Sequence, residues 1–240
     1  MRQLVAVAGA LGILGASVAG AASWERVHTS DDLTVDTRPH PGSEIKEVRA
    51  HGVMAAPPHV VRAVIADVAR YPEFMPYVKE SRVIARAPRG TTTYQRVSFG
   101  VLGALGVADR DYILRNVEQV TSREGRTSYK RIWNAITGND PPPQPGVVRL
   151  SVSKGFWELS PADEAGSQTR VIYCIFTNPG GSLPLWAINQ GNSIGVPKVF
   201  NAVRKTAMES RYRSTPLPGL PALMAGISDF SGLDESMCTE

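Results

Sequence analysis

TRVIYCIFTNPGGSLPLWAINQGNSIGVPKVFNAVRKTAMESRYR, residues 169–213, decides the fold of this chain. Val171–Thr177 is rich in β-branched and aromatic residues and apolar on both faces, which predicts a strand with neither side in bulk water. The NPGG sequence at 178–181 ends the strand, because proline removes a ladder donor and glycine permits a sharp reversal. Ser182 is a candidate cap for a following helix, and Pro184 is tolerated in its first turn.

A long helix is predicted to follow and to run as far as Arg213. Its apolar residues recur at helical spacing, so one stripe should pack against the rest of the protein. They are Leu185, Ile188, Val196, Val199, Val203 and Ala207. Gly191, Gly195 and Pro197 lie in its middle, and a proline there costs about 3 kcal/mol relative to alanine. These residues indicate a kink, two helices end to end, or a lid with a flexible point.

This C-terminal region resembles a known family. A final strand, a PGG turn, a PLWAIN helix start and a long closing helix are similar to the C-terminal half of the START (StAR-related lipid transfer) domain, here of a bacterial exported type. The resemblance spans roughly 24–213. It implies an α+β helix-grip fold, in which a curved antiparallel sheet wraps a long C-terminal helix and encloses an apolar cavity of lipid size.

The first 22 residues have the pattern of a secretory signal peptide. Met1-Arg2 gives a short positive start, 4–18 is an apolar and small-residue run, and AGAA at 19–22 offers a cleavage site. An uncleaved membrane anchor is the alternative, but the run is short for a bilayer span. We therefore expect export to the periplasm or the medium.

Composition indicates an ordinary globular protein. Of the 240 residues, 42% are hydrophobic and 20% charged, which excludes disorder throughout. Removing the signal peptide takes one Arg from 26 basic residues and leaves 25 against 22 acidic, a net charge of about +3. Such a weak charge, without a dense basic run, gives no indication of nucleic-acid binding.

The rest of the chain is organised as a meander of strands. Trp24–Val27 and Leu33–Thr37 are short extended segments, and 44–55 alternates like a strand. A helix begins at Pro57-Pro58 and stops at Tyr71, before an aromatic connector with the sequence YPEFMPYV. Six strand-like segments with short turns then predict an antiparallel sheet. They are 79–87, 92–101, 111–120, 128–136, 147–159 and 169–177.

We expect one domain over 23–213 and a flexible tail over 214–240. The two cysteines, Cys174 in the last strand and Cys238 in the tail, could form a bridge in an exported protein. A buried single thiol at Cys174 is the favoured interpretation.

The sequence holds no pattern that indicates a cofactor or a metal. Its four histidines lack ligand spacing, and no nucleophile elbow, phosphate loop or dinucleotide fingerprint is present. The best polar cluster, at 109–112, has a counterpart in START domains, which favours a structural role. One alternative is an enzyme of the cyclase or aromatase kind on the same scaffold, with Asp109, Arg110 or Tyr112 as acid or base. Another is a docking partner of a membrane system.

Alternation places Tyr112, Leu114 and Asn116 on one face of their strand. In several START lipid carriers an arginine at the position of Asn116 enters the cavity, and sterol carriers have an acidic residue on the preceding strand. The matching stretch here, 94–99, contains no Asp or Glu. The resemblance therefore favours a neutral or weakly polar lipid.

The predicted function is to bind, and to transfer, a lipid or another hydrophobic ligand in the cavity, gated by the C-terminal helix. We expect a monomer that contacts membranes transiently. Val148, Leu150, Val152 and Phe156 are predicted to share one face of a single strand. The candidate cavity and lid residues are Arg110, Tyr112, Leu114, Asn116, Trp133, Val152, Phe156, Tyr173, Trp186, Asn189, Val199 and Val203.

Overall fold

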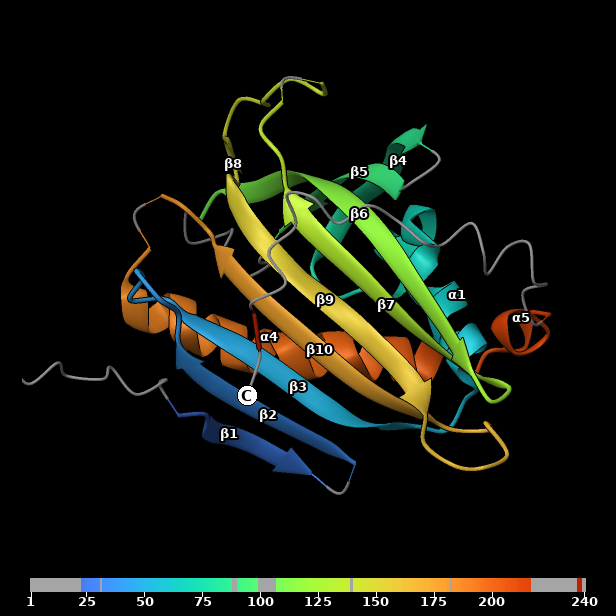
Figure 1. Cartoon of the computed structure of the whole chain (residues 1–240). Helices are drawn as coiled ribbons and strands as arrows, with labels where there is room; N and C mark the ends of the chain where they lie inside the picture. Colours follow the sequence, from blue (N-terminus) through green and yellow to red (C-terminus); the bar gives the residue numbers. More distant parts are fainter. Residues whose placement is uncertain are drawn as a thin grey trace, which may run out of the picture.

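The computed structural model describes residues 23–30, 32–87, 90–98, 107–138, 140–181, 183–216 and 237–238. A curved sheet forms most of the molecule, and Figure 1 views it from the outer face with α4 and α1 behind. Its strands follow the order β1-β2-β3-β10-β9-β7-β6-β5-β4, all antiparallel, and β8 pairs in parallel with β6. The strands are β1 (Glu25–Ser30), β2 (Leu33–Pro39), β3 (Lys46–Met54), β4 (Val78–Ala87), β5 (Gly90–Val97), β6 (Asp109–Arg123), β7 (Arg126–Ala135), β8 (Val147–Arg149), β9 (Val152–Pro161) and β10 (Thr169–Asn178).

The helices cover the inner face of the sheet. They are α1 (Pro58–Ala66), the 3₁₀ turn η1 (Val68–Arg70), α2 (Tyr71–Phe74), α4 (Leu185–Thr206) and α5 (Ser210–Arg213). Helix α4 packs against β2, β3 and α1, so the sheet grips it on one side and α1 closes beside it. The predicted helix-grip architecture is confirmed.

Helix α4 is buried only along its second half. Val196, Phe200 and Val203 are almost inaccessible to solvent. They join a core that includes Val60, Val61 and Val64 of α1 and the inward side chains of the sheet, which are apolar because the helices cover that face. Between Leu185 and Gly195, no described residue of α4 is buried.

The structure corrects two of the predicted elements. The segment predicted as one strand over 147–159 is divided at 150–151 into β8, which pairs with β6, and β9, which pairs with β7 and β10. The long helix passes through Gly191, Gly195 and Pro197 but ends at Thr206, and α5 is separate. The proposed cap Ser182 and the predicted signal peptide lie outside the described residues.

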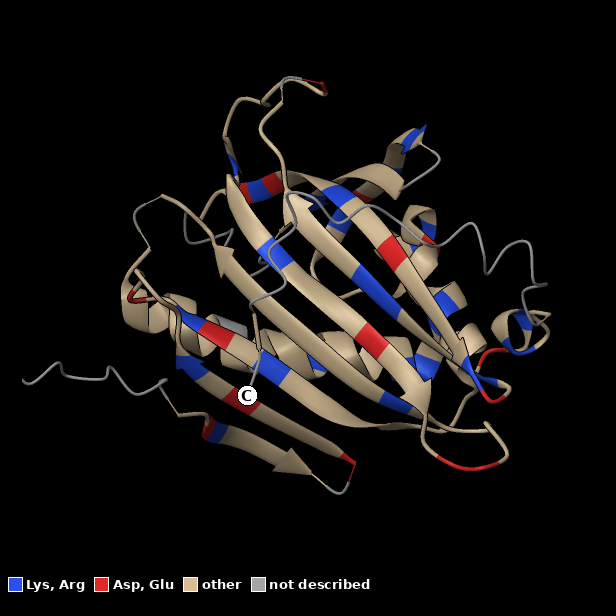
Figure 2. Cartoon of the chain, viewed as in Figure 1, with Lys and Arg blue, Asp and Glu red and all other residues tan. Residues whose placement is uncertain are grey.

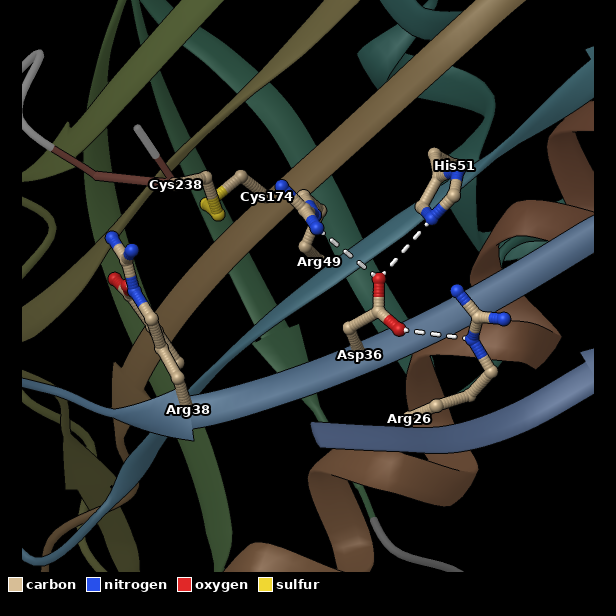
Figure 3. Close-up of polar contacts among 8 residues, drawn as sticks. Arg26, Asp36, Arg38, Arg49, His51, Cys174 and Cys238 are labelled. Atoms are coloured by element: carbon tan, nitrogen blue, oxygen red, sulfur yellow. Dashed lines mark hydrogen bonds and ion pairs between the residues drawn. A yellow bond between two sulfur atoms is a disulfide. The ribbon is translucent and has the colours of Figure 1, made fainter. Parts of the chain in front are cut away.

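A second apolar cluster lies on the outer face of the sheet. Ile132, Phe156 and Phe176 form a strip there, and the two described residues near the C-terminus, Met237 and Cys238, pack on it. Cys238 forms a disulfide with Cys174, with the two Cα atoms 6.2 Å apart. The favoured interpretation of Cys174 as a free thiol is therefore wrong: its side chain points outward, where the end of the chain returns to meet it (Figure 3).

Charged side chains of both signs are interspersed along the strands (Figure 2). The acidic residue of β2 is Asp36, a buried carboxylate that accepts hydrogen bonds from Arg26 and Arg49, each at 3.3 Å, and lies 3.1 Å from His51 Nε2 (Figure 3). The partners come from β1 and β3, so the Asp36 carboxylate on β2 contacts side chains of both neighbouring strands. A buried carboxylate of this kind needs such partners, because unpaired burial of its charge is costly.

The disulfide closes a loop across 64 residues. Cross-linking a loop of this length restricts the unfolded chain and should contribute about 2–4 kcal/mol to the free energy of unfolding. We expect Cys238→Ser to lower the stability by that amount in urea denaturation. Wild-type protein in reducing agent should unfold at the midpoint of the variant; equal midpoints for the oxidised wild type and the variant would contradict the assignment.

Candidate ligand-binding cavity

A cavity of about 210 Å³ lies between the inner face of the sheet, the α1–α2 segment and α4. It is mainly apolar, and β4, β5, β6, β7, β9 and β10 contribute to its wall. Its described lining consists of Ile65, Tyr71, Met75, Pro76, Tyr77, Val78, Gln95, Val97, Tyr112, Leu114, Asn116, Arg131, Trp133, Ser153, Trp157, Tyr173, Ile175 and Val199.

Half of the twelve candidate residues lie on this wall. They come from four separate elements, β6, β7, β10 and α4, which the sheet brings together around one space. These residues are Tyr112, Leu114, Asn116, Trp133, Tyr173 and Val199.

The other six candidates lie elsewhere. Val203 is in the core beside the cavity. Trp186 is 70% exposed on the first turn of α4. Asn189 links α4 to the start of β3, because its Oδ1 accepts a 3.0 Å hydrogen bond from the Lys46 amide. Val152 and Phe156 are on the outer face of β9, and Arg110 lies at the end of the sheet near the turn after β10.

The misplacement of Val152 and Phe156 has a simple cause. The two residues do share one face of β9, as alternation predicts, but this is the outer face. Phe156 is apolar there because it belongs to the second cluster, on which Met237 and Cys238 pack. The inward residues of β9 include Ser153 and Trp157, both of which line the cavity.

Aromatic rings form a continuous stack at the centre of the wall. The Tyr173 ring lies 4.1 Å from that of Trp157 and 5.8 Å from that of Trp133, centroid to centroid. Gly155 makes this possible, because a Cβ there would lie 2.5 Å from the Trp133 ring and 2.2 Å from the Cys174 carbonyl oxygen. Rings packed in this way give the wall a large, stiff apolar surface.

The polar groups of the wall mostly serve the protein itself. The Asn116 amide nitrogen is within hydrogen-bonding distance of the Thr93 hydroxyl and of the Thr91 and Leu114 carbonyls, at 3.0–3.3 Å. Only its Oδ1 is left to accept a bond from a ligand. The Tyr112 hydroxyl donates to Gln95 Oε1 at 3.0 Å.

Arg110 and Asp111 are structural in this geometry. The Arg110 guanidinium donates to the carbonyls of Pro179, Gly180 and Ala108, and so fastens the turn after β10 to β6. Asp111 is fully buried and accepts two hydrogen bonds from Arg149, at 2.7 and 3.0 Å. Neither side chain lines the cavity, so an acid/base role for Arg110 has no geometric support; of the three residues considered for such a role, Tyr112 alone is in the described lining.

Gln95 and Arg131 are cavity residues that sequence reasoning missed. The inward position of Arg131 was detectable, because it lies two residues from Tyr129 and two from Trp133, and every second side chain of a strand shares a face.

Among the described residues, no group of three or more His, Cys, Asp or Glu side chains could hold a metal ion. Nor does any helix in the described ranges have the length and apolarity to cross a membrane.

The comparisons with known proteins agree with this geometry. A family model described as START domain matches residues 18–213. The chain belongs to the START domain family. Phosphatidylcholine transfer protein of Mus musculus is 23% identical over 195 residues, which are 81% of this chain and 87% of that protein. An uncharacterized protein of Pseudomonas aeruginosa is 24% identical over 216 residues, covering 88% and 98% of the two chains.

Solved structures show the same fold. The STAR-related lipid transfer protein fragment from Xanthomonas axonopodis superposes with a TM-score of 0.67 at 24% identity, over 78% of this chain and 99% of that one. Human STARD10 gives a TM-score of 0.67 at 17% identity, over 84% and 85%. This START domain therefore has the fold of its relatives, with a cavity in the grip of the sheet.

Three cavity tyrosines make the stability sensitive to alkaline pH. Burial raises the pKa of Tyr71 to about 12, and it raises the pKa of Tyr112 and Tyr173 still further above the ordinary value of 10. Above pH 10 the unfolded chain loses these protons while the folded chain keeps them. The free energy of unfolding should therefore be intact below pH 10 and fall between pH 10 and 12, by about 1.4 kcal/mol per pH unit for each tyrosine.

Urea midpoints measured from pH 8 to 11 test this expectation. Tyr173→Phe keeps the ring stack and removes one ionisable group, so the fall above pH 10 should be shallower than in the wild type. Identical pH profiles for the two proteins would refute the assignment of Tyr173 to a water-poor site.

Proposed function

We propose that this START domain binds a lipid or another hydrophobic ligand in the cavity and transfers it between membranes. The observation that carries the proposal is an apolar, aromatic-lined space held open inside the helix-grip fold. Relatives named as lipid transfer proteins over most of their length support the ligand class. Each buried CH₂ contributes about 0.8 kcal/mol, so a long chain binds tightly without any reaction.

The size of the cavity implies that its walls move when a ligand enters. Ligand pockets usually have volumes of about 300–1,000 Å³, whereas this one has about 210 Å³. The closed form shown here is therefore too small for a whole diacyl lipid. An element of the wall must shift outward during loading.

Helix α4 is the element best suited to move. Its first half contains Gly191 and Gly195, has no buried residue among those described, and is held near its start by the Asn189 contact with β3. Its second half is locked into the core by Val196, Phe200 and Val203. Near the junction, Lys198 Nζ donates a 3.0 Å hydrogen bond to the hydroxyl of Tyr77, a cavity residue on the segment after α2. Such uneven packing favours local opening at the N-terminal half.

The outer surface of the same half-helix supports a transient membrane contact. Leu185, Trp186 and Ile194 are exposed there. Exposed large apolar residues on a segment that moves favour insertion into the interfacial region of a bilayer, where tryptophan is preferred.

We propose that the protein acts as a monomer after export. The Cys174–Cys238 disulfide supports export, because disulfides persist in oxidising compartments.

Native mass spectrometry of gently purified protein tests the ligand, and a vesicle assay tests the transfer. We expect a hydrophobic molecule to leave with the protein and to be recovered by solvent extraction. The protein should then accelerate movement of a pyrene-labelled lipid from donor to acceptor vesicles. A protein that is always empty, binds no lipid and leaves the spontaneous rate unchanged would overturn the proposal.

The gate is tested by stiffening α4 at its glycines. A Cβ added at Gly191 or Gly195 would meet no atom within 4 Å, so alanine fits at both positions. Each change should stabilise the helix by about 1 kcal/mol. We expect the double variant G191A/G195A to melt at a higher temperature and to transfer lipid several-fold more slowly.

Equilibrium affinity for the ligand is the control, because neither glycine lines the cavity. It should stay within about twofold of the wild type. A stabilised variant that transfers lipid at the wild-type rate would show that this half of α4 is not the gate.

A further inference from the structure

Arg131 is the one charged residue among the described residues that line the cavity. Its side chain is half-buried on the inner face of β7, between Tyr129 and Trp133. It makes no hydrogen bond or ion pair with any residue that the structure describes. An arginine has five N–H donors and is always charged, so its guanidinium faces the cavity wall with unused donors.

The carboxylate opposite Arg131 is bonded to a second arginine. Glu118 lies directly opposite Arg131 in the β6–β7 register, but it accepts a 2.6 Å hydrogen bond from Arg62 Nη2 on α1. The three residues Arg62, Glu118 and Arg131 together carry two positive charges and one negative charge, a net charge of +1. They line a small crevice that shares Ile65, Arg131 and Trp157 with the cavity. Of the three charged residues, Arg131 is the one that also lines the cavity.

A cation without a partner beside aromatic rings is costly for the folded protein. Removing charge from water is expensive unless an opposite charge compensates it. On the cavity side, the wall near Arg131 includes Ile65, Tyr71 and Trp157, none of which offers a negative charge. Unused polar groups at a cavity wall are typical of groups that a ligand completes.

We infer that Arg131 is the subsite for a single anionic group, a carboxylate or a phosphate, at the inner end of the cavity. This inference rests on the proposed ligand-binding function. Arg131 and Gln95 are paired across β6 to positions 118 and 112, so six residues, or about 20 Å, separate them along the strand. Gln95 marks the opposite end of the cavity, together with residues 75–78 and Val199. A ligand would enter from that end with its anionic group first, and its chain would then lie along the aromatic stack.

The small volume favours an amphiphile with one chain over a diacyl lipid in this closed form. The expectation of a neutral ligand rested on Asn116, which stands where some carriers have arginine. In this chain the cavity cation is Arg131, one strand further along the sheet on β7. We therefore expect an anionic ligand in place of a neutral one. The shared chemistry is an oxyanion that accepts bonds from a guanidinium, which arginine can hold in two-point geometry.

Calorimetric titration of the delipidated full chain with three matched compounds tests the inference. They are sodium oleate, oleoyl lysophosphatidate and oleyl alcohol, each below the concentration at which it aggregates. We expect the two anions to bind at least tenfold more tightly than the alcohol. A preference between the two anions then distinguishes a fatty-acid carboxylate from a lipid phosphate, and either preference supports the subsite.

Arg131→Met should weaken both anions about 10- to 100-fold, because a bond between charged groups is lost. Its affinity for oleyl alcohol should stay within threefold of the wild type. Arg131→Lys should recover part of the preference, because it keeps the charge. Arg115→Met is the matched control, since Arg115 is exposed on the outward side of the adjacent strand.

Thermal unfolding of the empty proteins gives a second readout. Arg131→Met should melt at a higher temperature than the wild type, because the unpaired charge is gone, whereas a structural arginine would make the variant melt lower. Equal binding of oleate and oleyl alcohol by the wild type would overturn the inference and leave the cavity's binding function intact. Failure of all three compounds and of diacyl lipid to bind would overturn the proposed function itself.

Discussion

The curved sheet has one inner face, and a single long helix has to cover it. Strands β2 and β3 and helix α1 receive α4, whose second half fills the grip with Val196, Phe200 and Val203. The inner side chains of β5, β6 and β7 lie beyond the reach of that stripe. The uncovered part of the wall becomes the cavity, so the cavity follows from the geometry of one helix on a wide sheet rather than from any special sequence motif.

Much of this arrangement could be predicted from residue patterns. The alternation along β6 correctly placed Tyr112, Leu114 and Asn116 on one face, and the valine stripe of α1 is buried as its spacing indicates. Local patterns of this kind survive folding because the same face that is apolar in sequence is the face that packs. The resemblance to START domains added the way in which the elements close around a space.

The errors came from facts that a local pattern does not contain. Val152 and Phe156 were assigned to the wrong face of β9, since the outer face of the sheet also has an apolar cluster, on which Met237 and Cys238 pack. The disulfide of Cys174 depends on a contact with a residue 64 positions away. Arg131 was overlooked because a charged residue in a strand normally faces solvent, and its inward direction follows only from its aromatic neighbours at 129 and 133.

Two features of this fold lower its stability, and both adjoin the cavity. The glycines of α4 weaken the helix at the half that the core does not hold, and the half-buried Arg131 lies beside aromatic rings without a described hydrogen-bond or ion-pair partner. Natural proteins often break local stability rules at functional sites, where the cost is offset elsewhere in the fold. A rigid helix with an apolar residue at 131 would give a more stable molecule, but that molecule would lack both a flexible entrance and a charge to orient its ligand.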